Sequence, residues 1–341
     1  MLYIDPFPPL LQSLVHPQKS SLELLDSHFN EFLLDNMAEQ LQFQDIIRAL
    51  MSADNEVRTA AETKYSEVQE TTRLQYLVHY MISGEHLELK TMAAILCRRL
   101  LSNMDDLMNV VDANVQETMK TELLKLLNSE SDDNMRKKVC DCVAELAKRY
   151  LDEEGNNQWP DVLKFLYECC NSGEDRLKEC ALHIIIAFPG IFGGQQDTYL
   201  QVIKEMLVSC IVPGIPDKVR LLAARASCMF IIECVEDTKF GFFADVYPGI
   251  LEMIKISVQQ AEDDNLLKSF VEVVELAPKL VKPQLHDTIN LMLAITSNTD
   301  IEDNWRHLGL EALVTLAETA PPMLRIHGNV HILYFFTFEL F

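Results

Sequence analysis

Apolar residues recur with the period of an α-helix through almost the whole of this chain. Between residues 135 and 150 they fall at the i, i+3, i+4, i+7 positions that form one buried helix face, and the same spacing returns between residues 219 and 230. Proline and glycine separate such segments, and Pro160 and Pro216 stand where a new apolar stripe begins. Glycine provides only 11 of the 341 residues. That scarcity disfavours strand-and-turn folds and phosphate-binding loops, so the sequence predicts an all-α protein.

The predicted helices come in pairs that recur at roughly 40 residues, a period typical of HEAT repeats. The second helix of several pairs begins with Asp or Asn followed closely by Arg or Lys, as in Asp175 and Arg176, Asp217 and Arg220, and Asp303 and Arg306. The acid suits a helix cap, and we expect the base to pair with the acid of the next repeat, which makes a ladder. The predicted fold is therefore an all-α HEAT-repeat α-solenoid, a right-handed superhelix of about seven helix pairs.

Domain boundaries follow from these pairs. We expect an atypical N-terminal extension at 1–37, HEAT repeats 1–7 at 38–327, and a hydrophobic tail at 328–341. The tail is either the start of an eighth repeat or a non-native end. The predicted helix pairs are 38–51 with 55–69, 71–83 with 86–101, 113–129 with 132–151, 158–171 with 174–188, 195–211 with 217–235, 240–260 with 263–277, and 282–297 with 301–320.

The charge of the chain narrows its partners. Twenty-nine basic and 52 acidic residues leave a net charge of −23, the wrong sign for nonspecific binding to nucleic acid. An acidic surface suits basic proteins instead. No uncharged apolar run reaches membrane-spanning length, and the nine cysteines form no CxxC pair and no zinc-like cluster. We therefore expect a soluble intracellular protein with reduced, buried thiols and with no metal, cofactor, membrane or nucleic-acid partner.

Catalytic motifs are missing from the sequence, which holds no GxSxG, HExxH, P-loop or GxGxxG pattern. Gly193-Gly194-Gln195 is either an anion-binding turn or, as we favour, an inter-helix loop. Trp159-Pro160 is a partner hot spot or, preferably, a packed helix entry. Cys169-Cys170 and the Cys140/Cys142 pair are redox sites or, preferably, core filling. The sequence therefore predicts no catalytic residue and a protein that acts by wrapping a partner along an extended surface.

Several strings resemble one family in particular. They include DEEGNNQWP at 152–160, FPGIFG at 188–193, MRKKVCD at 135–141 and LGLEALVTLAETA at 308–320. In this order they are similar to the karyopherin-β nuclear transport receptors of the importin-5 type, over about residues 38–329. Residues 1–36 precede the matching region as either an unusual N-terminus or a gene-model artefact, the match fails after Asn329, and many intervening positions differ. The chain thus resembles a diverged, truncated N-terminal third of such a receptor.

The resemblance implies a receptor that binds Ran-GTP, Phe-Gly nucleoporins and basic cargo such as ribosomal proteins or histones, and that occurs in the cytoplasm, the nucleus and the nuclear pore or envelope. In the family, Ran-GTP lies against the second helices of the first repeats. Here the matching candidates are Arg58, Glu62, Arg98, Arg99, Arg136, Lys137 and Asp141.

Phe-Gly segments dock between neighbouring first helices in this family. The aromatic start of the sixth pair supplies nucleoporin-docking candidates, and ordinary inter-repeat packing is the alternative interpretation of Phe240, Phe242, Phe243 and Tyr247. A second hypothesis for the whole chain is a truncated, non-transporting HEAT scaffold or regulator that binds basic proteins.

Overall fold

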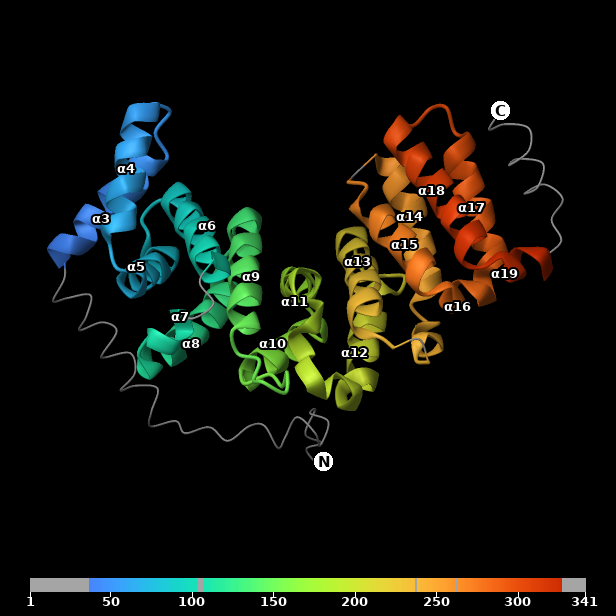
Figure 1. Ribbon diagram of the computed structural model, residues 1–341, viewed down its shortest axis with the longest axis horizontal. Coiled ribbons are helices and arrows are strands. Elements are labelled where there is room, and N and C mark those ends of the chain that lie inside the picture. Colours follow the sequence, from blue (N-terminus) through green and yellow to red (C-terminus); the bar gives the residue numbers. More distant parts are fainter. Residues whose placement is uncertain (1–36, 104–106, 237, 262, 327–341) are drawn as a thin grey trace. The chain divides into compact units, whose positions relative to one another are not determined.

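The computed structural model describes residues 37–103, 107–236, 238–261 and 263–326. Every regular element in these residues is a helix, and the described ranges contain no strand beyond one isolated bridge between Leu151 and Asn157 (Figure 1). The predicted all-α fold class is thereby confirmed. The predicted extension, apart from the backbone of Met37, and the predicted tail lie outside the described residues.

The chain divides into two compact units that meet between Gln195 and Gln196. The first unit holds four helix pairs and two short connecting elements. Its elements are α3 (Met37–Leu50), α4 (Asn55–Glu67), α5 (Glu70–Ser83), α6 (Leu87–Asn103), α7 (Leu107–Val110), α8 (Ala113–Ser129), α9 (Asp133–Lys148), α10 (Pro160–Cys170), α11 (Asp175–Ala187) and the 3₁₀ helix η1 (Pro189–Gln195).

The second unit holds three further pairs with short helices between and after them. Its elements are α12 (Gln196–Ile211), α13 (Asp217–Cys234), η2 (Phe240–Phe243), α14 (Tyr247–Gln260), α15 (Asn265–Leu276), α16 (Pro278–Val281), η3 (Lys282–Gln284), α17 (Leu285–Ser297), α18 (Asp303–Thr319) and α19 (Pro321–Ile326).

All seven predicted pairs are present. Most differences from prediction occur at prolines, and the unpredicted short helix α7, which begins at Leu107, is the exception. The segment expected as one helix over 240–260 is split into η2 and α14, because Pro248 in the first turn of α14 lacks the amide hydrogen that a continuing helix requires. The short helices η1, α16 and α19 each begin at a proline that follows a longer helix. The apolar period alone does not reveal such one-turn segments.

Acids cap the second helices α4 and α9, but the predicted caps Asp175, Asp217 and Asp303 are instead the first residues of α11, α13 and α18, whose N-cap residues make no side-chain bond. Asp54 accepts hydrogen bonds from the amides of Glu56 and Val57, at 2.8 and 3.4 Å, and Asp132 accepts one from Met135 at 2.8 Å. Each bond satisfies an amide that the first turn of a helix leaves without a partner. Capping therefore fixes where α4 and α9 begin.

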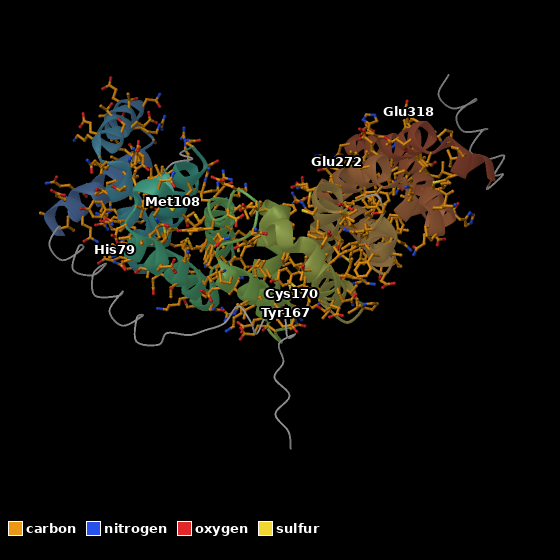
Figure 2. The ribbon with its side chains drawn as sticks, turned by 60° about the horizontal axis from the view of Figure 1, so that its bottom comes forward. His79, Met108, Tyr167, Cys170, Glu272 and Glu318 are labelled. Atoms are coloured by element: carbon orange, nitrogen blue, oxygen red, sulfur yellow. The ribbon has the colours of Figure 1, made fainter. Side chains whose placement is uncertain are left out.

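Second helices pack on one another in sequence, α6 on α9 and α9 on α11 in the first unit, and α13 on α15 and α15 on α18 in the second. The apolar stripe of each helix is thereby buried against two neighbours, which no single pair achieves alone. Met108 of α7 and Cys170 of α10 are buried, whereas Glu272 of α15 and Glu318 of α18 are exposed (Figure 2). The thioether and thiol thus fill the core of their repeats.

Two of the distinctive strings lock together in the first unit. The amide of Gly194 donates to the carbonyl of Gly155 at 2.7 Å, and the side chain of Asn157 donates to the carbonyl of Ile191 at 2.6 Å while it accepts from the amide of Trp159 at 2.6 Å. Gly193 has φ 62°, and a Cβ there would lie 2.2 Å from the Gly155 oxygen. Loop 151–158 and segment 188–195 are therefore one clamp, and the inter-helix interpretation of the double glycine agrees with this geometry.

No helix in the described residues is both long and apolar enough to span a membrane.

Candidate partner-binding surface

The predicted Ran-binding residues lie on three second helices, and the structure divides them by exposure. Arg98 and Arg99 on α6 are exposed, as is Lys137 on α9. Arg136 is only 5% exposed. Arg98 and Lys137 can therefore meet a partner from the surface, whereas Arg136 cannot without the repeat opening.

Arg136 serves the fold of its own repeat. Its guanidinium pairs with Asp133 and donates to the carbonyls of Glu130 and Ser131, at 3.2 and 2.9 Å. Those carbonyls lie just before α9, so the arginine ties the helix to the preceding turn. Arg136, predicted as a partner contact, therefore has a structural role.

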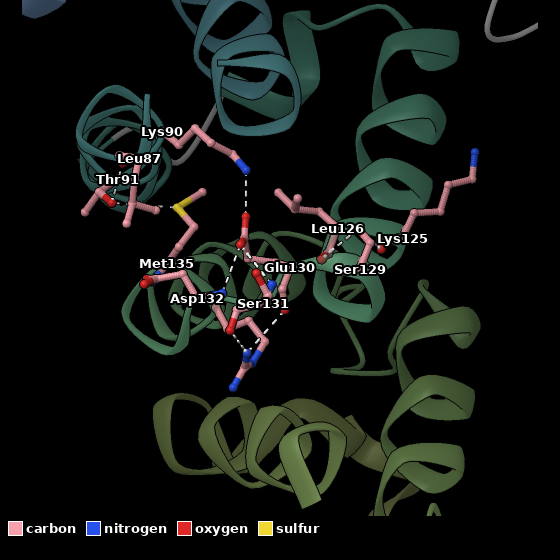
Figure 3. Close-up of polar contacts among 11 residues, drawn as sticks. Leu87, Lys90, Thr91, Lys125, Leu126, Ser129, Glu130, Ser131, Asp132 and Met135 are labelled. Atoms are coloured by element: carbon pink, nitrogen blue, oxygen red, sulfur yellow. Dashed lines mark hydrogen bonds and ion pairs between the residues drawn. The ribbon is translucent and has the colours of Figure 1, made fainter. Parts of the chain in front are cut away.

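Glu130 is the centre of this network, which Figure 3 shows. Its carboxylate meets the ammonium of Lys90 from α6 at 2.6 Å and accepts the amides of Ser131 and Asp132, at 2.9 and 3.0 Å. Burial alone raises the pKa of Glu130, but the hydrogen bonds from Asp132, Lys90 and Ser131 outweigh burial and hold that pKa below its ordinary value. The network joins the second and third helix pairs.

Asp141 of α9 is the half-buried acid among the predicted Ran-binding residues, whereas Glu62 is exposed. Burial raises its pKa above the ordinary value, and the nearby charges of Lys138 and Arg98 partly oppose that rise. The charge of Arg98 on α6 therefore acts on the carboxyl group of Asp141 on α9. Arg98, Lys138 and Asp141 belong to one polar area on two neighbouring second helices.

The remaining three predicted residues share a groove between α4 and α6. Arg58 and Glu62 of α4 and Arg99 of α6 line a space of about 710 Å³. Arg73 and Glu70 from the start of α5 complete its charged rim. The sequence pattern did not single out these last two residues, because they fall on a first helix.

Tyr65 forms one wall of this groove. Its ring lies 5.0 Å from the Arg73 guanidinium carbon and 5.9 Å from the ring of Phe43. Burial raises the pKa of the phenol to about 12, against the opposing charges of Arg73 and Arg99. Tyr65 therefore stays neutral and supports Arg73 through a cation–π contact.

A second, smaller groove lies between the first helices α8 and α10. It measures about 320 Å³, and its apolar lining includes Leu124, Trp159 and Phe165. Lys120 crosses one side, with its ammonium 3.9 Å from the centre of the Tyr150 ring. Trp159 is 1% exposed, so the tryptophan is mainly a packed helix entry whose edge reaches the groove.

The aromatic segment of the second unit is largely internal. Phe240, Phe243 and Tyr247 are buried, and the Tyr247 hydroxyl lies 2.8 Å from that of Thr288. Only Phe242 of the four is half-exposed, and its ring carries the Lys204 ammonium 4.6 Å from its centre. Three of the four nucleoporin-docking candidates thus pack between repeats, the alternative that the sequence left open.

The predicted ladder takes a different form from the one expected. Arg220 pairs with Asp217 and Arg306 pairs with Asp303, in each case within one helix, because i, i+3 spacing brings the two side chains together. Arg220 also reaches Glu252 of α14 at 2.5 Å. Arg220 therefore links its repeat to the next first helix and not to the acid of the next second helix, whereas Arg306 bonds within its own pair.

Asp175 and Arg176 follow the same pattern with other partners. Asp175 lies 3.7 Å from Lys178, while Arg176 pairs with Glu174 at 2.7 Å and donates to the carbonyl of Asn128 at 2.9 Å. The last bond crosses to α8 of the preceding pair. A main-chain oxygen therefore takes the place that the prediction gave to an acid.

Chemistry beyond binding has little support in the described ranges. They contain no group of three or more His, Cys, Asp or Glu residues placed to hold a metal ion. Eight of the nine cysteines are buried, and burial raises the pKa of Cys228 and of Cys234 to about 12. Thiols held neutral in this way are poor nucleophiles.

Comparison with known proteins finds similarity to importins. The family model described as "IPO5-like, TPR repeats" matches residues 131–291. Importin subunit beta-3 of Saccharomyces cerevisiae is 26% identical over 308 residues, which cover 83% of this chain and 27% of that protein. The probable importin-5 homolog of Dictyostelium discoideum is 21% identical over 285 residues, which cover 80% and 26%.

A solved structure agrees with these sequence matches. The crystal structure of Kap121p has a TM-score of 0.68 and 25% identity, over 87% of this chain and 27% of that one. The chain therefore spans about a quarter of the length of the relatives it matches. The resemblance predicted from its sequence is confirmed: this chain is similar over most of its length to importins of the importin-5 type and shares the helical-repeat fold of Kap121p.

Proposed function

We propose that this chain acts as a nuclear import receptor-like protein that does no chemistry and binds its partners by surface complementarity. Its partners would be Ran-GTP, Phe-Gly nucleoporins and basic cargo, met in the cytoplasm, the nucleus and at the pore. The support is the likeness to proteins named importins and to structures of Kap121p bound to RanGTP, to Nup53p and to Ste12p.

The observation that carries the proposal is the exposed basic surface on consecutive second helices. Arg98 and Arg99 of α6 and Lys137 of α9 face solvent on a chain whose net charge is −23. Cationic side chains so placed suit a partner surface that supplies acids, and two adjacent helices form a platform for a folded protein. Ran in its GTP form is the partner that the family resemblance implies for this surface.

In this proposal, nucleoporins bind in the groove between α8 and α10 and not at the predicted aromatic segment. Its Leu124, Trp159 and Phe165 lining suits an inserted phenyl ring, and the two helices are neighbouring first helices. Phe242 remains a second, smaller docking point. The buried Phe240, Phe243 and Tyr247 contribute by holding the repeats together.

Cargo binding follows from charge. Exposed acids gather at helix connections, among them Glu153 and Glu154 in the first unit and Asp300, Glu302 and Asp303 in the second. A Lys/Arg-rich segment would gain from such a cluster in either unit, in a salt-dependent way.

The test is a titration of the full chain with Ran loaded with a non-hydrolysable GTP analogue or with GDP. We expect tighter binding of the GTP form and an affinity lowered about tenfold by Lys137→Glu. Lys279→Glu, which makes the same charge change at an exposed position of α16, is the matched control and should leave the affinity unchanged. Equal affinity for both nucleotide states would refute the proposal. Retained binding of basic peptides in that case would favour the scaffold hypothesis.

A further inference from the structure

The groove between α4 and α6 is cationic on an acidic protein. Three arginines, Arg58, Arg73 and Arg99, line it against two glutamates, Glu62 and Glu70. The chain as a whole has 52 acidic and 29 basic residues. A local excess of positive charge therefore departs from the background, and it is concentrated around a space of about 710 Å³.

The three arginines differ in how many hydrogen-bond and ion-pair partners they have within the protein. Arg58 donates to the carbonyl of Ser52 at 2.9 Å and contacts the side chain of Asn55, which fixes it beside the groove. Arg73 lies 3.4 Å from Glu70 through one terminal nitrogen, and its buried Nε has no hydrogen-bond acceptor. Within the described residues, Arg99 has no hydrogen-bond or ion-pair partner. Because each guanidinium carries five N–H donors, all three arginines have donors left over, and Arg99 has the most.

The groove stays open because α4 is poorly buried. Ala61 is the one buried residue of α4, and Tyr65, the large aromatic side chain of that helix, lines one wall of the space without closing it. Leu96 and Leu100 of α6 line its floor together with Leu50 at the end of α3. An apolar floor beneath arginines suits a ligand that carries both carboxylates and aliphatic groups.

We propose that this groove binds an acidic segment of a partner protein, in which Asp or Glu side chains alternate with large aliphatic residues. The carboxylates pair with Arg99 and Arg73, for which planar bidentate geometry is the natural match, and the aliphatic groups rest on Leu96 and Leu100. Arg58, already held by its own turn, adds charge without reorganising. Inorganic phosphate or nucleic acid would use the arginines and leave the apolar floor bare, so the combination selects a peptide.

This inference goes beyond the proposed Ran binding and does not depend on it. It shares Arg58, Glu62 and Arg99 with the predicted Ran surface, but not Arg98 or Lys137. The two proposals can therefore fail separately: loss of nucleotide-selective Ran binding leaves the peptide groove standing, and absence of peptide binding leaves the Ran proposal standing.

The experiment measures fluorescence anisotropy of a labelled short peptide of alternating Glu and Leu with the full chain. The same peptide with Gln in place of Glu shows what the carboxylates contribute. Arg99→Gln tests the groove, and Arg98→Gln is the matched control, because both arginines are exposed neighbours on α6 and only Arg99 lines the groove. Circular dichroism of each variant confirms an unchanged helix content.

We expect the Glu-Leu peptide to bind and the Gln-Leu peptide to bind at least about tenfold more weakly. Arg99→Gln should weaken the Glu-Leu peptide about tenfold, and Arg98→Gln less than about twofold, as suits a charge that acts only through solvent. Equal effects of the two substitutions would overturn the assignment to this groove. Tighter binding of a short oligouridine than of the Glu-Leu peptide would overturn the choice of a peptide.

Discussion

Replacing Glu130 with alanine removes the acceptor that joins two helix pairs. The ammonium of Lys90, whose side chain is 19% exposed, would lose its partner, and the amides of Ser131 and Asp132 would lose the carboxylate they bond. One charge-assisted bond and two amide bonds to a carboxylate are at stake, partly compensated by water that enters the site. We expect the free energy of unfolding of the first unit to fall by about 3 kcal/mol.

The matched control is Glu122→Ala in α8. Glu122 also meets a lysine at 2.6 Å, but that lysine, Lys125, is 57% exposed. An exposed pair within one helix contributes about 0.5 kcal/mol. The two substitutions therefore delete ion pairs of equal length that differ in burial and in the amides that depend on them.

The assay uses the two tryptophans, one in each unit. In a Trp305→Phe background, the fluorescence of buried Trp159 reports on the first unit during thermal or urea unfolding. At about 2–4 °C per kcal/mol, Glu130→Ala should lower the midpoint by about 6–12 °C and Glu122→Ala by about 2 °C or less. Equal shifts for the two variants would refute the reasoning that burial and the amide bonds give Glu130 its importance.

Two further predictions concern pH and backbone strain. The pKa of Glu130 is lowered in the folded protein, so its carboxylate stabilises the fold fully above the unfolded pKa of about 4.3, and this contribution is lost as pH falls through the folded pKa. Glu130→Gln should therefore make the free energy of unfolding fall less steeply as the pH is lowered into the acid range. An unchanged pH dependence would contradict the assignment. Gly193→Ala should cost about 3 kcal/mol or more, because it adds a 2.2 Å contact with the Gly155 oxygen to a positive φ. Gly214→Ala, with φ 97° and no heavy atom within 4 Å, isolates the φ cost of about 1–2 kcal/mol, and equal losses in thermal melts would show that the clash is relieved.

The clamp formed by Gly193 and Gly155 shows how local sequence and tertiary contact divide the work. A loop between α11 and α12 was predictable from the double glycine and the preceding proline. That Gly193 must be glycine follows from its positive φ and from the approach of loop 151–158, which is distant in sequence. Both strings carried the family resemblance, and the structure supplies one physical reason for their composition.

Arg136 and Arg99 illustrate the same limit for the candidate surface. Both are arginines on second helices, and the sequence pattern gives each the same standing as a partner contact. One faces the carbonyls before α9 and is buried, whereas the other faces an open groove. Which face of a helix is covered depends on how closely the next repeat packs, and α4 packs more loosely than α9.

The sequence by itself determined the helical class, the seven pairs and the negative charge, because the apolar period, the capping acids and the prolines act within a few residues of one another. It also carried the likeness to importin-5 proteins. Only the tertiary structure decided which aromatic rings lie in the core, which arginines donate hydrogen bonds to main-chain carbonyls, and where a groove stays open. Those outcomes depend on contacts roughly 40 residues apart, and pairing across that distance is set by the stacking of whole repeats.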